Sequence, residues 1–160
     1  VLRERGLYPQ AEREFLGVIS VAPKHAPAHS GLAVLYDLMR RPEQAQARYQ
    51  SALALVPRDA SIWNNYGFSL YLARRDVEAI ESLEKALSLD PSMVQAYNNL
   101  GFAYARRGDE TNALRCFRAI SGKRAAYVNL AIAYSRIGRD GRARELMQRA
   151  EKITDDGEML

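Results

Sequence analysis

Residues 63–91 of the chain read WNNYGFSLYLARRDVEAIESLEKALSLDP, and a similar stretch, YNNLGFAYARRGDETNALRCF, follows at residues 97–117. In the first stretch, Trp63, Gly67 and Leu70 share one face of a helix, because residues spaced by three or four positions lie on the same side. The same spacing begins again after a short polar segment. Each stretch therefore predicts a helix, a tight turn and a second helix.

A small residue recurs at one position of every second helix that this pattern predicts. The positions are Ala11, Ala45, Ala79, Ala113 and Ala143, which lie 34, 34, 34 and 30 residues apart. A large apolar residue follows four positions after each of them, at Phe15, Tyr49, Leu83, Phe117 and Met147. Such a period indicates stacked supersecondary units, since a single compact domain requires no period of this length.

Residues that start and stop helices lie at the expected places between these units. Asp76 and Asp109 occupy predicted N-cap positions, Pro42 lies in a first helical turn, and Asp90 with Pro91 ends a second helix. The pattern also predicts which side chains are buried. They are Trp63, Leu70, Leu83, Tyr97, Leu100, Tyr104, Phe117 and Tyr134.

These residues resemble the tetratricopeptide repeat, whose pattern is W-x2-L-G-x2-Y, then A-x3-F, then P. The second unit carries it at Trp63, Tyr66, Gly67, Leu70, Ala79, Leu83, Ala86 and Pro91, and the third at Tyr97, Leu100, Gly101, Tyr104, Ala113 and Phe117. The first unit departs from it with His29 and Ala33 in place of Trp and Gly. The resemblance implies an all-α fold, a right-handed superhelical solenoid of antiparallel helix pairs, and binding of other proteins.

The repeat predicts how the chain is divided. Residues 1–25 are expected to hold a partial repeat, consisting of the end of one helix and a complete second helix, with the missing part upstream of Val1. Whole repeats are expected at residues 26–59, 60–93 and 124–153, the last with a capping helix, and a repeat shortened by four residues at 94–123. Residues 154–160 are expected to fray.

The sequence contains no recognisable catalytic motif. A Gly-rich phosphate loop, a Ser/His/Asp set and a metal-binding Cys pair are all missing. His25 and His29 are spaced i, i+4, but two ligands fall short of the three or four that metal sites use, so a packing role is expected for His29. Cys116 is expected to be a small packed residue. We therefore predict no enzymatic activity, no cofactor, no metal and no small-molecule substrate.

The charge of the chain allows two interpretations. The formal net charge is +4, and 19 of the 23 basic residues are Arg. One interpretation is a solvated rim, because the Arg residues are spread along the chain and interleaved with Glu and Asp. The other is a basic site for nucleic acid or an acidic partner at Arg74, Arg75, Arg106, Arg107 and Arg136. No apolar run is long enough to span a membrane, so any membrane contact would require an anchor outside this chain.

First helices line the concave face of such a stack, so their remaining side chains are candidates for a binding groove. The candidate groove residues are Asn64, Asn65, Phe68, Tyr71, Asn98, Asn99, Phe102, Arg106, Asn129 and Ile132. Asn65, Asn99 and Asn129 precede the same repeat position, and a carboxamide can pair with any peptide backbone. This series is similar to the asparagine ladder by which some tetratricopeptide superhelices grip extended peptides. The alternative is that each Asn bonds the backbone of the neighbouring repeat.

Two functions follow from this reasoning. The first is a non-catalytic scaffold that binds an extended or helical peptide segment of a partner in the concave groove. The chain is also similar to the tetratricopeptide lipoproteins of bacterial tight-adherence pilus systems, which help place an outer-membrane secretin. That resemblance implies a role in pilus or secretion-machine assembly at the periplasmic face of the outer membrane, whereas a cytoplasmic location is expected without it. The second function is a structural module that self-associates through its terminal repeats.

Overall fold

The computed structural model describes the backbone of residues 2–153 and the side chains of residues 7–153. Helices α1 to α9 occupy Leu2–Val21, Ala26–Leu38, Pro42–Leu55, Ala60–Leu72, Asp76–Leu89, Val94–Arg107, Glu110–Ile120, Lys123–Arg136 and Asp140–Glu151. Short turns join them, and no β-strand is found in the described part of the chain. The all-α class predicted from the sequence is confirmed.

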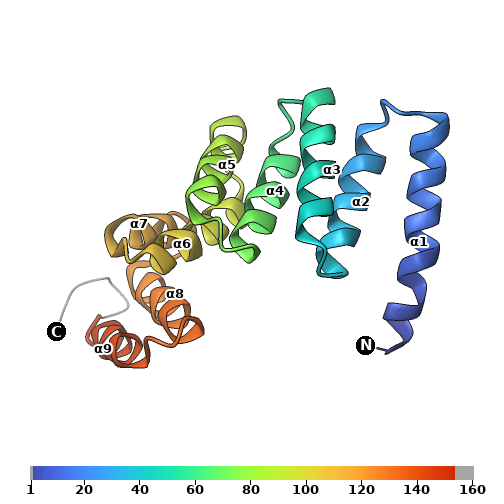
Figure 1. Cartoon of the computed structure of the whole chain (residues 1–160). Coiled ribbons are helices and arrows are strands. Elements are labelled where there is room, and N and C mark those ends of the chain that lie inside the picture. The colour runs from blue at the N-terminus through green and yellow to red at the C-terminus, as the bar shows by residue number, and fades with distance from the viewer. Residues whose placement is uncertain (1, 154–160) are drawn as a thin grey trace.

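The helices form antiparallel pairs that stack into a curved solenoid, from α1 at one end to α9 at the other (Figure 1). The pairs are α2 with α3, α4 with α5, α6 with α7, and α8 with α9. Successive first helices also contact each other, from α2 to α4, α4 to α6 and α6 to α8, whereas successive second helices do not. The first helices therefore lie on the inner, concave side of the curve.

The first segment of the chain differs from the sequence prediction. A helix end, a turn and a second helix were expected there, but α1 is one continuous helix from Leu2 to Val21 that includes Pro9. Leu, Arg and Glu at residues 2–5 are good helix formers, so they extend the helix in place of a turn. The predicted fraying of residues 154–160 lies outside the described residues.

Most of the helix boundaries follow the expected chemistry. The Asp109 carboxylate accepts a hydrogen bond from the Asn112 amide at 3.0 Å, which caps α7. Pro42 is the first residue of α3, and Asp90 lies directly after the end of α5. The four-residue shortening of the third repeat falls in α7, which has 11 residues where α5 has 14.

Two cap assignments need revision. Asp76 is the first helical residue of α5 and does not act as its N-cap, because its carboxylate instead binds the Arg106 side chain of the next repeat. Asp59 is an N-cap that the sequence reasoning missed. Its carboxylate accepts from the amides of Ser61 at 2.9 Å and Ile62 at 3.1 Å.

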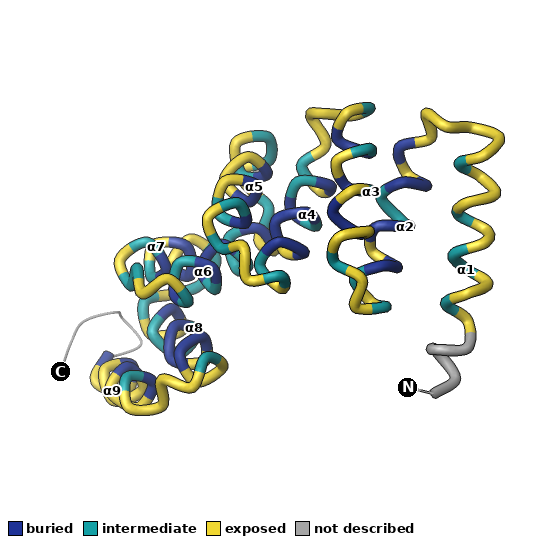
Figure 2. The backbone as a smooth tube through the Cα atoms, viewed as in Figure 1, coloured by how far each residue is buried: buried dark blue, intermediate teal, exposed yellow. Residues whose placement is uncertain are grey.

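A layer of buried residues runs between the paired helices along the solenoid (Figure 2). Five of the eight side chains predicted to be buried belong to it: Leu70, Leu83, Leu100, Phe117 and Tyr134. Trp63, Tyr97 and Tyr104 are only partly buried, and for these three the prediction is wrong. Two of them keep a polar edge near the surface. The indole N–H of Trp63 donates to the Pro57 carbonyl at 2.9 Å, and the Tyr104 hydroxyl donates to Glu84 at 2.6 Å.

The last repeat packs differently from the aligned pattern. Met147 was aligned with Phe117 as the large core residue of the second helix, but Met147 is exposed and Leu146 is fully buried in its place. Ala143, Leu146 and Ala150 are the buried residues of α9, with spacings of three and four positions. Ala131 stands in α8 where the third repeat has Gly101.

Glycines set the closest helix crossings. A Cβ on Gly67 would lie 2.7 Å from Leu83 Cγ, and a Cβ on Gly101 would lie 2.6 Å from Phe117 Cε1. A Cβ on Gly31 would likewise lie 2.6 Å from Cε1 of the Phe15 ring in α1. Gly31 occupies the position that Asn65 holds in the next repeat. The asparagine series is therefore interrupted in the first repeat because Phe15 fills the space that a longer side chain would need.

Candidate functional site

The concave face contains two neighbouring hollows that share Phe68. The first, of about 420 Å³, lies between α2 and α4 and is lined by the apolar residues Val34, Leu38, Phe68 and Leu72 together with Asp37, Arg40, Tyr49 and Asn65. We call it the apolar hollow. The second, of about 240 Å³, extends from α4 to α6 and α8. Its lining residues are Phe68, Tyr71, Asn98, Asn99, Phe102 and Arg136. We call it the amide hollow.

A chain of carboxamides connects the two hollows. Asn99 Nδ2 donates to Asn64 Oδ1 at 3.0 Å, and Asn64 Nδ2 donates to Asn65 Oδ1 at 3.2 Å. Asn65 lines the apolar hollow, Asn99 lines the amide hollow, and Asn64 is buried between them. The structure thus brings three of the predicted groove residues together. Their bond between repeats runs from side chain to side chain, which differs from the side-chain-to-backbone bond considered as the alternative.

The predicted apolar groove residues differ in how far they are available. Phe68 is exposed and stacks on Tyr71, with ring centroids 6.3 Å apart. Phe102 is partly buried, with its ring edge-on to the core residue Phe117 at 5.6 Å. Ile132 is exposed but lies further along, in a hollow between α8 and α9 that it shares with Met147. Asn129 of α8 lines neither the apolar nor the amide hollow.

Arg106 is held inside the solenoid and does not present a free charge to the groove. Its Nε donates to the two carboxylate oxygens of Asp76 at 2.8 and 3.0 Å, and its guanidinium lies 3.6 Å from the centroid of the Tyr71 ring. It also donates to the Tyr71 carbonyl. Only 9% of its side chain is exposed. Arg106 therefore acts as a clamp between the second and third repeats, and the sequence reasoning that placed it in a groove or a basic rim missed this role.

The other arginines of the predicted basic rim do not form one uniform patch. Arg75 pairs with Glu78 and also donates to Gln46 of the preceding repeat. Arg136 lies over the Phe102 ring, 4.9 Å from its centroid, in the amide hollow. Arg74 and Arg107 are exposed. Because three of the five guanidinium groups of this set contact protein groups, the geometry favours local structural roles over one continuous phosphate-binding surface.

Asp37 is a site residue that is absent from the predicted groove set, although it holds the same repeat position as Tyr71. Its carboxylate lies in the wall of the apolar hollow, where Ser69 Oγ donates to Oδ1 at 2.7 Å and the Tyr49 hydroxyl donates to Oδ2 at 3.1 Å. Burial raises the pKa of Asp37 above its ordinary value, against the opposing effect of these two hydrogen bonds. Burial beside this carboxylate also raises the pKa of Tyr49. The hollow therefore combines apolar walls with one partly desolvated acid.

Leu38 and Leu72 were also missed. Each follows an exposed groove residue by four positions, Val34 in α2 and Phe68 in α4, and so lies on the same helix face. This spacing was visible in the sequence. The repeat pattern does not use these positions, so it gave no reason to examine them.

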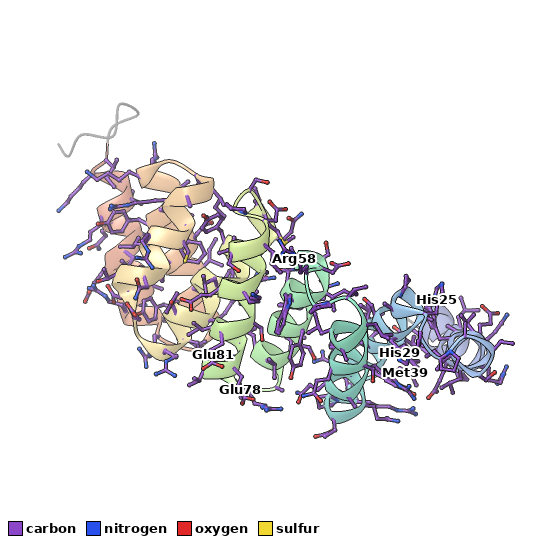
Figure 3. All side chains as sticks on the ribbon, turned by 90° about the horizontal axis from the view of Figure 1, so that it is seen from above. His25, His29, Met39, Arg58, Glu78 and Glu81 are labelled. Atoms are coloured by element: carbon purple, nitrogen blue, oxygen red, sulfur yellow. The ribbon has the colours of Figure 1, made fainter. Side chains whose placement is uncertain are left out.

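The two histidines have structural roles. His25 caps α2 by accepting from the Ala28 amide at 3.1 Å, and His29 Nε2 lies 2.8 Å from the Pro23 carbonyl, both at the start of α2 (Figure 3). Within residues 7–153 no group of three His, Cys, Asp or Glu side chains is placed to hold a metal ion. Cys116 is buried, which raises the pKa of its thiol to about 11. No helix in the described part of the chain has the length and hydropathy needed to cross a membrane.

Solved structures of tetratricopeptide proteins resemble this fold along most of its length. MamA is 21% identical, with a TM-score of 0.75 over 93% of this chain and 90% of its own. PilW, described as a widely conserved type IV pilus biogenesis factor, is 26% identical, with a TM-score of 0.72 over 95% of this chain and 74% of its own. YrrB, a TPR protein with an unusual peptide-binding site, is 19% identical, with a TM-score of 0.71 over 97% and 82%.

Family models agree with these structural matches. Tetratricopeptide repeat models match residues 28–61 and 124–152, and a TPR repeat model matches residues 77–108, so that together they span more than half of the chain. No curated protein sequence matches it. Tetratricopeptide proteins generally bind other proteins or peptides, and the fold supports a protein-interaction scaffold. The chain belongs to the tetratricopeptide repeat family.

Proposed function

We propose that this protein is a non-catalytic scaffold that binds an extended or helical segment of another protein along its concave face. One observation carries the proposal. Val34, Leu38, Phe68 and Leu72 surround a single hollow and are 39 to 59% exposed. Apolar side chains gathered at a concave surface and left in water are typical of a binding site.

The carboxamide chain supports the same proposal. Asn65 and Asn99 lie in the two hollows, so a segment that passes from one hollow to the other would cross both amides. A carboxamide offers a donor and an acceptor to a passing backbone whatever its sequence. The hollows would then take side chains while the asparagines bind main-chain groups.

The likeness to PilW motivates a biological context for this scaffold. PilW is described as a pilus biogenesis factor, and it is 26% identical to this chain over most of its length. We propose that the partner belongs to a bacterial pilus or secretion assembly. YrrB, a TPR protein with an unusual peptide-binding site, supports peptide recognition as the mode of binding.

The proposal is tested by capturing partners with matched variants. Phe68→Ser combined with Leu72→Ser removes two walls of the apolar hollow, and Val77→Ser combined with Val94→Ser removes two exposed apolar residues elsewhere on the solenoid. We expect partners captured by the native protein and by the Val77/Val94 variant to be lost from the Phe68/Leu72 variant. If both variants capture the same proteins as the native chain, the concave face is not the binding surface.

Self-association is a second candidate, favoured by the exposed apolar residues of α1. Leu7, Leu16, Val18 and Val21 are all exposed on this terminal helix. A second copy could cover them. Sedimentation at increasing protein concentration tests this, since a size that stays monomeric up to high concentration excludes it.

A further inference from the structure

The Asp37 carboxylate lies in the wall of the apolar hollow beside apolar side chains, and Arg40, Tyr49 and Asn65 also line this hollow. Val34 and Leu38 flank it on α2, and Leu72 faces it from α4. Its two hydrogen bonds come from neutral hydroxyl groups, those of Ser69 and Tyr49. A carboxylate offers about four lone-pair sites, so two hydroxyl donors leave part of its accepting capacity open to the hollow.

No cation of the described residues forms an ion pair with Asp37. Two other acidic residues at contacts between repeats have such partners: Asp76 pairs with Arg106, and Glu110 pairs with Arg142. Arg40 lies at the rim of the same hollow but forms no ion pair with Asp37. No ion pair within the described residues therefore balances this partly buried acid.

We propose that the apolar hollow is a subsite for an arginine or lysine side chain of the bound segment. The aliphatic stem packs between Leu38 and Leu72, and the cationic end reaches Asp37. This inference rests on the peptide-binding function proposed above and specifies which side chain the first hollow takes.

The physical properties of the hollow match those of a long basic side chain. Arginine and lysine bury three or four methylene groups along apolar surface while their charge finds a polar partner. A guanidinium also donates in a planar fork that suits a carboxylate. A purely apolar side chain would desolvate Asp37 further without pairing it, which is unfavourable. The hollow therefore discriminates in favour of a basic residue.

The neighbouring amide hollow has a different chemistry, which would fix the orientation of a bound segment. Its lining residues include Arg136, with its guanidinium over Phe102, and no carboxylate. A basic side chain is therefore favoured in the apolar hollow and disfavoured in the amide hollow. A bound segment would lie with its basic residue toward α2 and its neutral or acidic residues toward α8.

Three acetylated and amidated pentapeptides of sequence Ala-Leu-X-Leu-Ala test the proposal, with X as arginine, its neutral isostere citrulline, or leucine. Binding is followed by NMR of the Leu38 and Leu72 methyl groups during titration of the whole protein. We expect the arginine peptide to bind about tenfold more tightly than the citrulline peptide, as one charge-assisted contact supplies about that factor. The arginine and citrulline peptides should both shift the methyl resonances of Leu38 and Leu72.

Variants distinguish the contribution of the Asp37 charge to binding from that of the apolar side chains. Asp37→Asn should reduce the preference for arginine over citrulline to less than about twofold, with its thermal melting measured to show that it folds. Leu72→Ser should weaken the arginine and citrulline peptides by the same factor. Arg40→Gln leaves Asp37 in place and should widen the preference, because it removes a competing cation from the rim.

Equal binding of the arginine and citrulline peptides to the native protein, or a preference that survives Asp37→Asn, would overturn the proposal. Shifts at Asn98 and Phe102 without shifts at Leu38 and Leu72 would overturn it too, while leaving the concave face as the binding surface. If none of these groups responds and partner capture is also unaffected by Phe68→Ser with Leu72→Ser, the proposed function fails together with the inference.

Discussion

Asn99 of the third repeat donates to the side-chain oxygen of Asn64 in the second repeat, at 3.0 Å. This bond crosses the boundary between two repeats and lies between the two hollows of the concave face. It gives Asn99 a structural role in addition to the proposed role in binding.

Replacing Asn99 with Ala should lower both stability and partner affinity. Loss of its bond to Asn64 is expected to lower the free energy of unfolding by about 1 kcal/mol, because Asn64 is buried and loses its donor. Asn129→Ala serves as the matched control, since Asn129 holds the equivalent position and lines neither hollow. Urea unfolding and partner titration of both variants measure the two effects. If Asn99→Ala weakens binding with unchanged stability, the bond between repeats contributes nothing.

Replacing Arg106 with Ala should destabilise the solenoid by about 2–3 kcal/mol, because Asp76 then loses its cation while remaining largely covered. The variant also loses the contact of the guanidinium with the Tyr71 ring. Arg107→Ala is the control, as Arg107 is the adjacent arginine and is exposed. Chemical unfolding should give a lower free energy of unfolding for Arg106→Ala than for Arg107→Ala. Equal stability of the two variants would show that Arg106 is not a clamp.

The helix pairs and the contact of Asp76 with Arg106 illustrate what the sequence could and could not predict. The helix pairs were predictable because packing positions such as Gly67 and Leu83 recur with a fixed period and contact each other within one repeat. Asp76 was assigned as a cap from its local sequence, whereas its actual partner, Arg106, lies 30 residues away on the next repeat. Contacts of long side chains between repeats depend on rotamers and on the curvature of the stack. A periodic pattern carries no information about either.

The candidate site shows the same division. Phe68 and the asparagines were predicted for the concave face because first helices line it. The apolar hollow was not predicted, since it requires Leu38 and Leu72 from successive repeats to stand on either side of Asp37. Asp37 shares its repeat position with Tyr71 and Ala105, so the period placed it on the concave face but gave no sign that a carboxylate at this position has a role of its own.

Substitution of glycine should separate a crowded helix crossing from an open position. Gly67→Ala would place a Cβ 2.7 Å from Leu83 Cγ and 3.1 Å from the Ala79 carbonyl oxygen, so we expect a loss of about 1–3 kcal/mol in the free energy of unfolding. Gly141→Ala has no atom within 4 Å of the new Cβ, and should be neutral or stabilising by up to about 1 kcal/mol. Thermal unfolding of both variants checks this. A Gly67→Ala protein as stable as the native one would show that the helices can separate without penalty.

The pairing of Glu110 with Arg142 should make the last two repeats sensitive to acid. The hydrogen bonds from Arg142, opposed by partial burial, leave the pKa of Glu110 below its ordinary value. A carboxylate whose pKa is lowered by folding stabilises the folded state above its unfolded pKa, and this contribution is lost as the pH falls through the folded pKa. Glu110→Gln should therefore lower the melting temperature at pH 7 and have no effect near pH 2. A difference that persists unchanged at pH 2 would contradict this origin.

The preference of the apolar hollow for arginine should depend on pH, whereas its affinity for neutral peptides should be constant. Burial raises the pKa of Asp37 in the free protein, and a bound guanidinium would lower this pKa. The preference for arginine should therefore be complete above the pKa of Asp37 in the free protein. It should vanish as the pH falls through the pKa of Asp37 in the complex. Arg40 and Tyr49 also line this hollow, and burial beside the carboxylate raises the pKa of Tyr49 further above its ordinary value, so Tyr49 does not titrate in this range. Titrating the arginine and citrulline peptides between pH 4 and pH 7 measures the effect, and Asp37→Asn should make both curves flat. Loss of arginine binding with the same pH profile in Asp37→Asn would mean that a different group titrates.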